Sequence, residues 1–335
     1  MLATPVLRTV ERHGLFARLI ESGPAGSGAL AAGLGLDPDT LDRMLLLLTA
    51  LGVVGRGEAG EYAVPELVRP FLDRRDPRYV GGFLDHLAGG TTARLARLDD
   101  YLRHGRPAGA ASPFDEVYRD EESTRAFMAA MWDLSYGTSA ELAALADLGG
   151  TTRLVDVGGA TGPFAVAALR AAPGLRAVVF DLPAIRPLAE ETAYAHGLAG
   201  RLDFAGGDFF ADELPAADCL AFGYILSDWD DETCVELLRK AYRACTAPGQ
   251  VLIMDRLFAD DRTGPLPTAA MNLVMHVEMA GRHRTAAEFV ALLTAAGFTG
   301  CEVRRSTGEK HLIVGHKAGH AGGRPSRSRT SPAAG

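Results

Sequence analysis

From Arg153 onward, short apolar runs rich in β-branched residues alternate with longer stretches of helical periodicity. Alternating strands and helices predict a parallel sheet with helices on both of its faces. The last two apolar runs follow each other closely, which predicts an antiparallel edge. We therefore expect a seven-stranded mixed sheet of the Rossmann-like α/β class, with strands at 154–155, 177–180, 202–204, 219–222, 251–254, 301–303 and 311–314.

The part of the chain before this sheet has apolar residues at helical spacing and few strand signals. Short helices are predicted at 27–35 and 40–51, the second one capped by Asp37. A glycine-rich turn then joins apolar residues within 53–64 in a pattern that resembles a hairpin. Helix, helix and hairpin form a winged-helix arrangement. Its second helix offers a single cation, Arg43, where a reader of DNA needs several, so a dimerisation module is favoured over a DNA-binding or regulatory one.

These patterns divide the chain into three parts. Residues 1–145 are predicted to be a helical, winged-helix-like dimerisation and lid domain, and 146–317 a sheet domain that holds the ligand site. Residues 318–335 are rich in Gly, Ser, Arg and Pro, which predicts a disordered tail.

Composition narrows the function classes. A formal net charge of −8 gives no reason to expect a nucleic-acid partner. The four cysteines show no metal-ligand spacing, which is typical of buried thiols in a reducing compartment. The charged N-terminal residues do not resemble a signal peptide, and the longest apolar run, 44–54, is too short to cross a bilayer. We therefore expect a cytoplasmic protein without a membrane partner.

A glycine-rich turn, 156–162, joins the first predicted strand to a helix, at the edge where doubly wound sheets bind ligands. A phosphate-binding P-loop needs Gly-Lys-Ser/Thr, but Pro163 follows Gly162 here. A dinucleotide site needs Gly-x-Gly-x-x-Gly, and the carboxylate of Asp156, two residues before Gly158, would repel a pyrophosphate. The same carboxylate suits the ammonium and sulfonium charges of S-adenosylmethionine.

Two more carboxylates follow the next two predicted strands. Asp181 stands 23 residues after Gly158, where it can accept hydrogen bonds from both ribose hydroxyls. Asp208 is placed to contact the adenine, with Phe209 beside the ring. Taken singly, Asp181 could face solvent and Asp208 could cap a helix. Three carboxylates at three successive strand ends together predict S-adenosylmethionine as the cofactor.

Several ordered motifs are shared with one known family, at 154–162, 180–183, 207–210, 228–232, 281–285 and 288–289. From about residue 5 to 316 the chain resembles the S-adenosylmethionine-dependent O-methyltransferases of the plant caffeic-acid type and their bacterial relatives in pigment and antibiotic biosynthesis. The resemblance implies a homodimer and a small-molecule acceptor. It also implies cofactor contacts, with Trp229 against the adenine and Ser135 near the methionine end, so that the predicted cofactor residues are Gly158, Gly159, Asp181, Leu182, Asp208, Phe209, Trp229 and Ser135.

The catalytic positions depart from that family. A phenol titrates near pH 10, so a general base helps it to react at neutral pH. The resemblance places a basic His where this chain has Ser227, and acids where it has Asp255 and His283. An unassisted serine cannot deprotonate a phenol. Our hypothesis is that His283 is the base, acting from the opposite wall, while Ser227 relays or orients a proton. The alternative is a histidine without a chemical role.

Other interpretations stay open. Catalysis without a base, by positioning of an acidic hydroxyl, is one. A relative that retains the cofactor for hydroxylation or decarboxylation is another, as is a C-methyltransferase. A metal on the loose set Asp228, His276, Glu278 and His283 is also conceivable, although no metal is predicted.

The acceptor is predicted to be an aromatic or polycyclic compound with a free hydroxyl. A helix at 268–281 carries methionines every four residues, a stripe that is usually part of a core but lines the acceptor pocket in the resembled family. The predicted acceptor-binding residues are Phe127, Met131, Met275, His276 and Met279.

Overall fold

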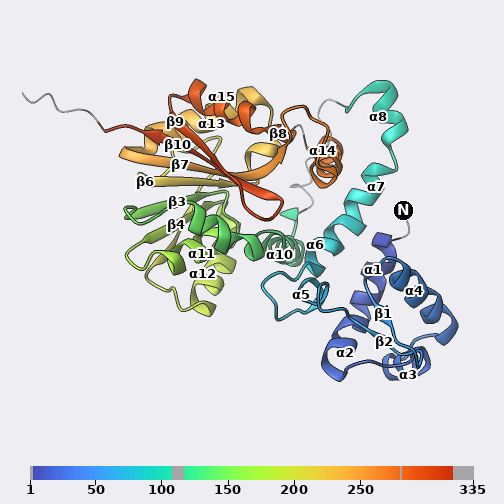
Figure 1. Ribbon diagram of the computed structural model, residues 1–335. Coiled ribbons are helices and arrows are strands. Elements are labelled where there is room, and N and C mark those ends of the chain that lie inside the picture. Colours follow the sequence, from blue (N-terminus) through green and yellow to red (C-terminus); the bar gives the residue numbers. More distant parts are fainter. Residues whose placement is uncertain (1–2, 108–116, 280, 320–335) are drawn as a thin grey trace, which may run out of the picture.

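The computed structural model describes residues 3–107, 117–279 and 281–319, and a mixed sheet forms its centre (Figure 1). The strands are β3 (Arg153–Val157), β4 (Arg176–Asp181), β5 (Leu202–Gly206), β6 (Ala217–Gly223), β7 (Cys245–Phe258), β8 (Arg284–Thr285), β9 (Thr299–Arg304) and β10 (Lys310–Lys317). Their order is β5-β4-β3-β6-β7-β10-β9, with the short β8 beside β7. Strands β3 to β7 pair in parallel, whereas β10 runs antiparallel to both β7 and β9. The predicted α/β class and its antiparallel edge are confirmed.

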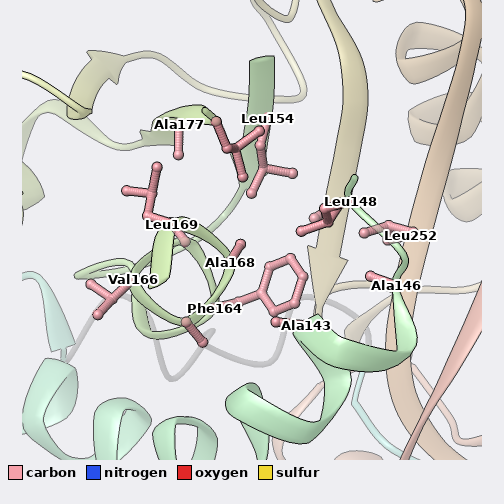
Figure 2. Close-up of a cluster of buried hydrophobic side chains, with 14 of the residues drawn as sticks. Ala143, Ala146, Leu148, Leu154, Phe164, Val166, Ala168, Leu169, Ala177 and Leu252 are labelled. Carbon is pink, nitrogen blue, oxygen red and sulfur yellow. The ribbon is translucent and has the colours of Figure 1, made fainter. Parts of the chain in front are cut away.

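Helices cover both faces of this sheet. Successive side chains of a strand point to opposite faces, so Leu154 and Val155 of β3 enter two different hydrophobic clusters. The helices of this part are α10 (Glu121–Leu145), α11 (Pro163–Ala171), α12 (Arg186–Ala195), α13 (Asp231–Ala244), α14 (Leu266–Glu278) and α15 (Ala286–Ala296), with short turns η2 (Pro183–Ile185) and η3 (Leu226–Asp228). Figure 2 shows the first cluster, in which Phe164 and Ala168 of α11 pack between Leu154 and the end of α10.

The N-terminal elements have a hydrophobic core of their own. They are α1 (Ala3–Arg12), α2 (Leu15–Ser22), α3 (Ser27–Leu34), α4 (Pro38–Ala50), β1 (Gly55–Arg56) and β2 (Tyr62–Ala63), and Figure 1 shows them apart from the sheet. The predicted cap of α4 is present, because the Asp37 carboxylate accepts a hydrogen bond from the Thr40 amide at 2.8 Å. The hairpin begins at Gly55 rather than at residue 53. Its winged-helix role stays a prediction.

Between the two parts lie α5 (Arg69–Leu72), α6 (Gly81–His86), the π-helix η1 (Leu87–Thr91), α7 (Thr92–Leu95) and α8 (Leu98–His104). The predicted domain boundary at 145 coincides with the end of α10, yet Leu142 and Ala143 of that helix belong to the core of the sheet. None of the described helices combines the length and the apolar character needed to span a membrane. Residues 320–335 of the predicted disordered tail lie outside the described residues.

Candidate active site

Two adjoining cavities open where the parallel strands end, the edge at which this sheet type binds ligands. The larger has a volume of about 600 Å³ and is lined by the glycine turn after β3. The smaller has a volume of about 90 Å³ and lies against α14. Phe127, Met131, Tyr224 and Asp228 line both cavities. A ligand in the larger cavity and one in the smaller would therefore meet at these four side chains.

The glycine turn is fixed by backbone geometry. Gly158 has a φ of 63° and Gly162 a φ of 86°, in the left-handed region that favours glycine. A Cβ on Gly159 would lie 2.7 Å from the carboxyl carbon of Asp156. The backbone can therefore approach a ligand closely here, and Gly158 and Gly159 both line the larger cavity.

The carboxylate of Asp181 is at the centre of this wall. Its two oxygens accept hydrogen bonds from the Ala160 and Leu182 amides, each at 2.7 Å, which hold the group in place while leaving lone pairs for a ligand. Burial raises the pKa of Asp181 to about 6. Burial also raises the pKa of Asp156 to about 7, against a hydrogen bond from the Ala165 amide that lowers it. Cationic or hydrogen-bond-donating ligand groups would stabilise both carboxylates.

The structure brings the eight predicted cofactor residues to this one cavity, namely Gly158, Gly159, Asp181, Leu182, Asp208, Phe209, Trp229 and Ser135. The Asp208 carboxylate accepts a hydrogen bond from the Phe210 amide at 2.8 Å, so it also closes a turn. The indole Nε1 of Trp229 is buried without a hydrogen-bond partner. A buried donor of this kind is usually satisfied, so a ligand is a natural partner for it.

Two residues of the larger cavity had no place in the sequence prediction. Lys310, the first residue of β10, is buried, and its Nζ lies 3.7 Å from the centre of the Tyr224 ring. Burial lowers the pKa of the Lys310 ammonium to about 7. Tyr224 itself has a φ of 60°, uncommon for a tyrosine, and it lines both cavities. No local motif marks either residue.

The smaller cavity contains a histidine–carboxylate pair. The buried His283 has its Nδ1 3.1 Å from the Oδ1 of Asp255, which lies within β7. A carboxylate oxygen accepts, so Nδ1 carries the hydrogen and Nε2 keeps its lone pair. Nε2 is buried and has no hydrogen-bond partner. Ser227 lines the same cavity, whereas Asp255 lies behind the imidazole. The three predicted catalytic residues are thus assembled around one cavity.

The loop that carries His283 is anchored from three directions. The His283 amide donates to the Asn272 side chain of α14 at 2.8 Å. The fully buried Arg284 donates to the carbonyl oxygens of Leu226 and Trp229 at 2.7 and 2.8 Å. Gly281 packs so tightly that a Cβ there would lie 2.0 Å from the Ser227 carbonyl oxygen. Together these contacts press the histidine loop against the Ser227 segment.

Not all predicted acceptor residues reach the cavities. Met275 and Met279 line the smaller one together with Met271, and Phe127 and Met131 line both. His276, in contrast, is exposed, lines neither cavity and packs edge-on against Tyr101 of α8 at 6.4 Å. One residue along a helix is a rotation of about 100°, so a neighbour of Met275 faces away from the methionine stripe. The assignment of His276 to the acceptor site is not supported by its position.

The pKa values of two other carboxyl groups of the smaller cavity are shifted in opposite directions. Burial, with the nearby charges of Asp255 and Glu278, raises the pKa of Asp228 well above its ordinary value. Burial alone would raise the pKa of Glu278, but hydrogen bonds from His86 and Thr91 lower it. Within the described residues, no three His, Cys, Asp or Glu side chains are grouped to hold a metal ion. The metal alternative therefore has no support among them.

Comparison with known proteins defines the class. A family model described as an O-methyltransferase domain matches residues 95–299, and this chain belongs to that family. Acetylserotonin O-methyltransferase of Bos taurus is 34% identical over 329 residues, covering 94% of each chain. The 3-hydroxy-5-methyl-1-naphthoate 3-O-methyltransferase of Streptomyces sahachiroi is 32% identical over 319 residues, covering 94% of this chain and 92% of the relative. The structure of human N-acetylserotonin methyltransferase in complex with SAM superposes with a TM-score of 0.86 at 28% identity. The superposition covers 95% of this chain and 94% of the human one.

The predicted family and cofactor are confirmed. The chain is an O-methyltransferase that uses S-adenosylmethionine. The larger cavity fits this cofactor, because its walls combine a glycine turn for close backbone approach with buried carboxylates and an unpartnered indole donor. Nothing in the family match determines which group removes the acceptor's proton.

Proposed function

We propose that the protein transfers a methyl group to a hydroxyl of an aromatic or polycyclic small molecule, and that His283 removes the proton of that hydroxyl. The bound cofactor supplies an electrophilic methyl group on a sulfonium. Gly158, Gly159 and Asp181 would hold its nucleoside half, and Trp229 would lie against the adenine. The acceptor would occupy the smaller cavity, where the methionines of α14 supply an apolar wall.

The observation that carries this proposal is the His283–Asp255 pair with its unpartnered Nε2. Among the other groups of the smaller cavity, Asp228 has a raised pKa, which favours its neutral acid form, and a neutral acid cannot take a proton. The lowered pKa of Glu278 makes it a weak base. Two imidazoles of the described residues line this cavity, and His86 faces the carboxylate of Glu278, whereas the Nε2 of His283 has no partner and can accept a proton. Asp255 would stabilise the imidazolium that forms, and Ser227 would orient the hydroxyl.

The test uses His283→Ala and, as a matched control, His276→Ala on the exposed side of α14. Wild-type protein, S-adenosylmethionine and a panel of phenolic and polycyclic acceptors are incubated and the products read by mass. We expect a gain of one methyl unit, and a fall in kcat of about 10²- to 10⁴-fold for the His283 variant alone. The pH dependence of kcat attributable to a base should disappear with it.

Other outcomes contradict the proposal. Full turnover by His283→Ala would show that positioning of an acidic hydroxyl suffices without a base. A gain of one oxygen or a loss of carbon dioxide would indicate a relative that retains the cofactor but no longer methylates. A methyl group found on carbon would identify a C-methyltransferase.

We also propose a homodimer, as predicted from the family resemblance. Its support is a set of exposed apolar side chains on α8 and α14, which lie next to each other through the Tyr101–His276 contact. Leu102 is 88% exposed and Leu266 is 81% exposed, an unfavourable arrangement for an isolated chain. Light scattering after size exclusion measures the mass, and a monomer at micromolar concentration would contradict the proposal. A cytoplasmic location stays a prediction.

A further inference from the structure

The chain has three lysines, against many arginines, and two of them have evident structural roles. Lys240 donates to three main-chain carbonyls of the segment after β5, at 2.6 to 2.9 Å. Lys317 ends β10, lies over the Tyr242 ring at 4.5 Å, and donates to the carbonyls of Tyr242 and Cys245 at 2.6 and 2.7 Å. The N–H donors of these two ammonium groups therefore have good acceptors.

Lys310 stands at the other end of the same strand and is partnered far less well. It is only 3% exposed, yet among the described residues its Nζ makes one hydrogen bond, a long one of 3.4 Å to the Oγ of Ser135. In the part of the chain that the structure describes, no carboxylate oxygen lies within ion-pair distance of its Nζ. An ammonium group has three donors, and burying it without acceptors is costly. A buried and underpartnered amino group that faces a cavity would be stabilised in its ammonium form by an anionic ligand group.

The surroundings of Lys310 locate that group. The Lys310 side chain lines the larger cavity and lies over Tyr224, whose ring also borders the smaller one. Across the sheet, Lys310 is in register with Arg256, the residue after Asp255. It therefore lies at the junction between the cofactor cavity and the cavity of the His283–Asp255 pair.

We propose that Lys310, assisted by the Ser135 hydroxyl, binds a carboxylate group of a ligand at this junction. A monoanion fits better than a phosphate, because this junction offers the ammonium of Lys310 and the hydroxyl of Ser135 while the carboxylates of Asp156 and Asp181 also line the larger cavity. Two sources provide this chemistry: the amino-acid end of the cofactor, and an acid group on the aromatic acceptor. The inference rests on the proposed function, since it places both ligands in the two cavities.

The first experiment tests whether the carboxylate that Lys310 binds belongs to the cofactor. Titration calorimetry measures the binding of S-adenosylmethionine and of decarboxylated S-adenosylmethionine to the wild type and to Lys310→Met, which keeps the length of the side chain but not its charge. If the cofactor's carboxylate is the ligand, the variant binds S-adenosylmethionine about tenfold or more weakly and binds the decarboxylated form like the wild type. Lys310→Arg should recover part of the loss. Lys317→Met, at the other end of the strand, is the matched control.

The second experiment tests the acceptor, with S-adenosylhomocysteine bound. Binding of 3-hydroxy-2-naphthoate is compared with binding of 2-naphthol, which lacks the acid group. If the acceptor carries the carboxylate, Lys310→Met loses about tenfold for the naphthoate and nothing for the naphthol, while its affinity for S-adenosylmethionine is unchanged. The proposal is overturned if Lys310→Met binds all of these ligands like the wild type, or if it binds the acid and the non-acid member of a pair more weakly by the same factor. Lys310 then has a packing role only.

Both readouts are binding constants, so they are independent of methyl transfer. A wild type that binds these ligands but yields no methylated product would contradict the proposed function while leaving the role of Lys310 testable. Circular dichroism and thermal unfolding of Lys310→Met establish that the variant is folded. If the folded variant shows the same ratio of Kd values for acid and non-acid ligands as the wild type, the proposal is refuted.

Discussion

Gly281 gives a quantitative test of how the site is assembled. An alanine Cβ at this position would lie 2.0 Å from the carbonyl oxygen of Ser227, 2.2 Å from the carbonyl carbon of Asp228 and 2.5 Å from the amide nitrogen of Trp229. All three atoms belong to the backbone, so a change of rotamer cannot relieve the clash. Because a Cβ essentially never approaches closer than 3.0 Å, Gly281→Ala must separate the two segments by about 1 Å.

That separation moves His283 relative to Ser227 and to the cavity between them. Displacement of a catalytic group by about 1 Å can cost about 10²-fold in rate, so kcat should fall by about that factor. Overpacking of this kind also lowers the free energy of unfolding by about 1–3 kcal/mol. The affinity for S-adenosylmethionine should also weaken, because the displaced segment carries Trp229, which lines the larger cavity.

The assays are steady-state kinetics, calorimetry with S-adenosylmethionine, and unfolding in urea. Gly150→Ala serves as the control, since an added Cβ there meets no heavy atom within 4 Å. Wild-type kcat and stability in Gly281→Ala would refute the close packing of the two segments and the catalytic role derived from it.

Three other experiments test single contacts. Asp255→Asn should lower kcat by about 10²- to 10⁴-fold, because an amide no longer fixes the imidazole tautomer of His283. Its affinity for S-adenosylmethionine should be unchanged. A variant with wild-type kcat would contradict a catalytic role for the His283–Asp255 pair. Arg284→Met removes the guanidinium donors of the Leu226 and Trp229 carbonyls and leaves them only the weak thiol donor of Cys234. Urea unfolding should then show a loss of about 3 kcal/mol, and a loss below about 1 kcal/mol would mean that water replaces the guanidinium. Burial raises the pKa of Asp181 to about 6, so its accepting, ionised form is lost below that pH. As the pH falls below about 6, the Kd for S-adenosylmethionine should rise by up to about tenfold per pH unit. Asp181→Asn should bind the cofactor weakly at every pH, without this pH dependence.

Features encoded by neighbouring residues could be predicted from the sequence. The glycine turn, the Asp37 cap and the alternation of strands with helices are local, and the structure contains each of them. The bounds of elements were less predictable. β7 extends from Cys245 to Phe258, although Pro248 and Gly249 near its start are poor strand residues, because Cys245 still pairs with Ala217 of β6.

Features that depend on distant residues could not be predicted in the same way. Nothing near Lys310 in the sequence indicates that Ser135 and Tyr224 will lie beside its ammonium group. A weak signal was present, since lysine is rare in this chain and one of three stands at the start of a strand in the ligand-binding half. His276 shows the opposite error, because its sequence neighbours were part of a cavity wall while its own helical position pointed outward.

The proposed base role of the His283–Asp255 pair would explain how a departure from a family motif can leave a function in place. A base requires only a nitrogen lone pair within reach of the acceptor and a carboxylate behind the ring, and either wall of a narrow cavity can supply it. Here the wall containing Ser227 has no imidazole, and the facing loop provides one. An imidazole on the facing loop can replace one at position 227 only if that loop is held as firmly as the Ser227 segment. Arg284 and Gly281 provide this hold, because one ties the loop to the carbonyls of Leu226 and Trp229 and the other allows the backbones to touch. Catalysis should therefore be as sensitive to these two anchors as to the histidine itself.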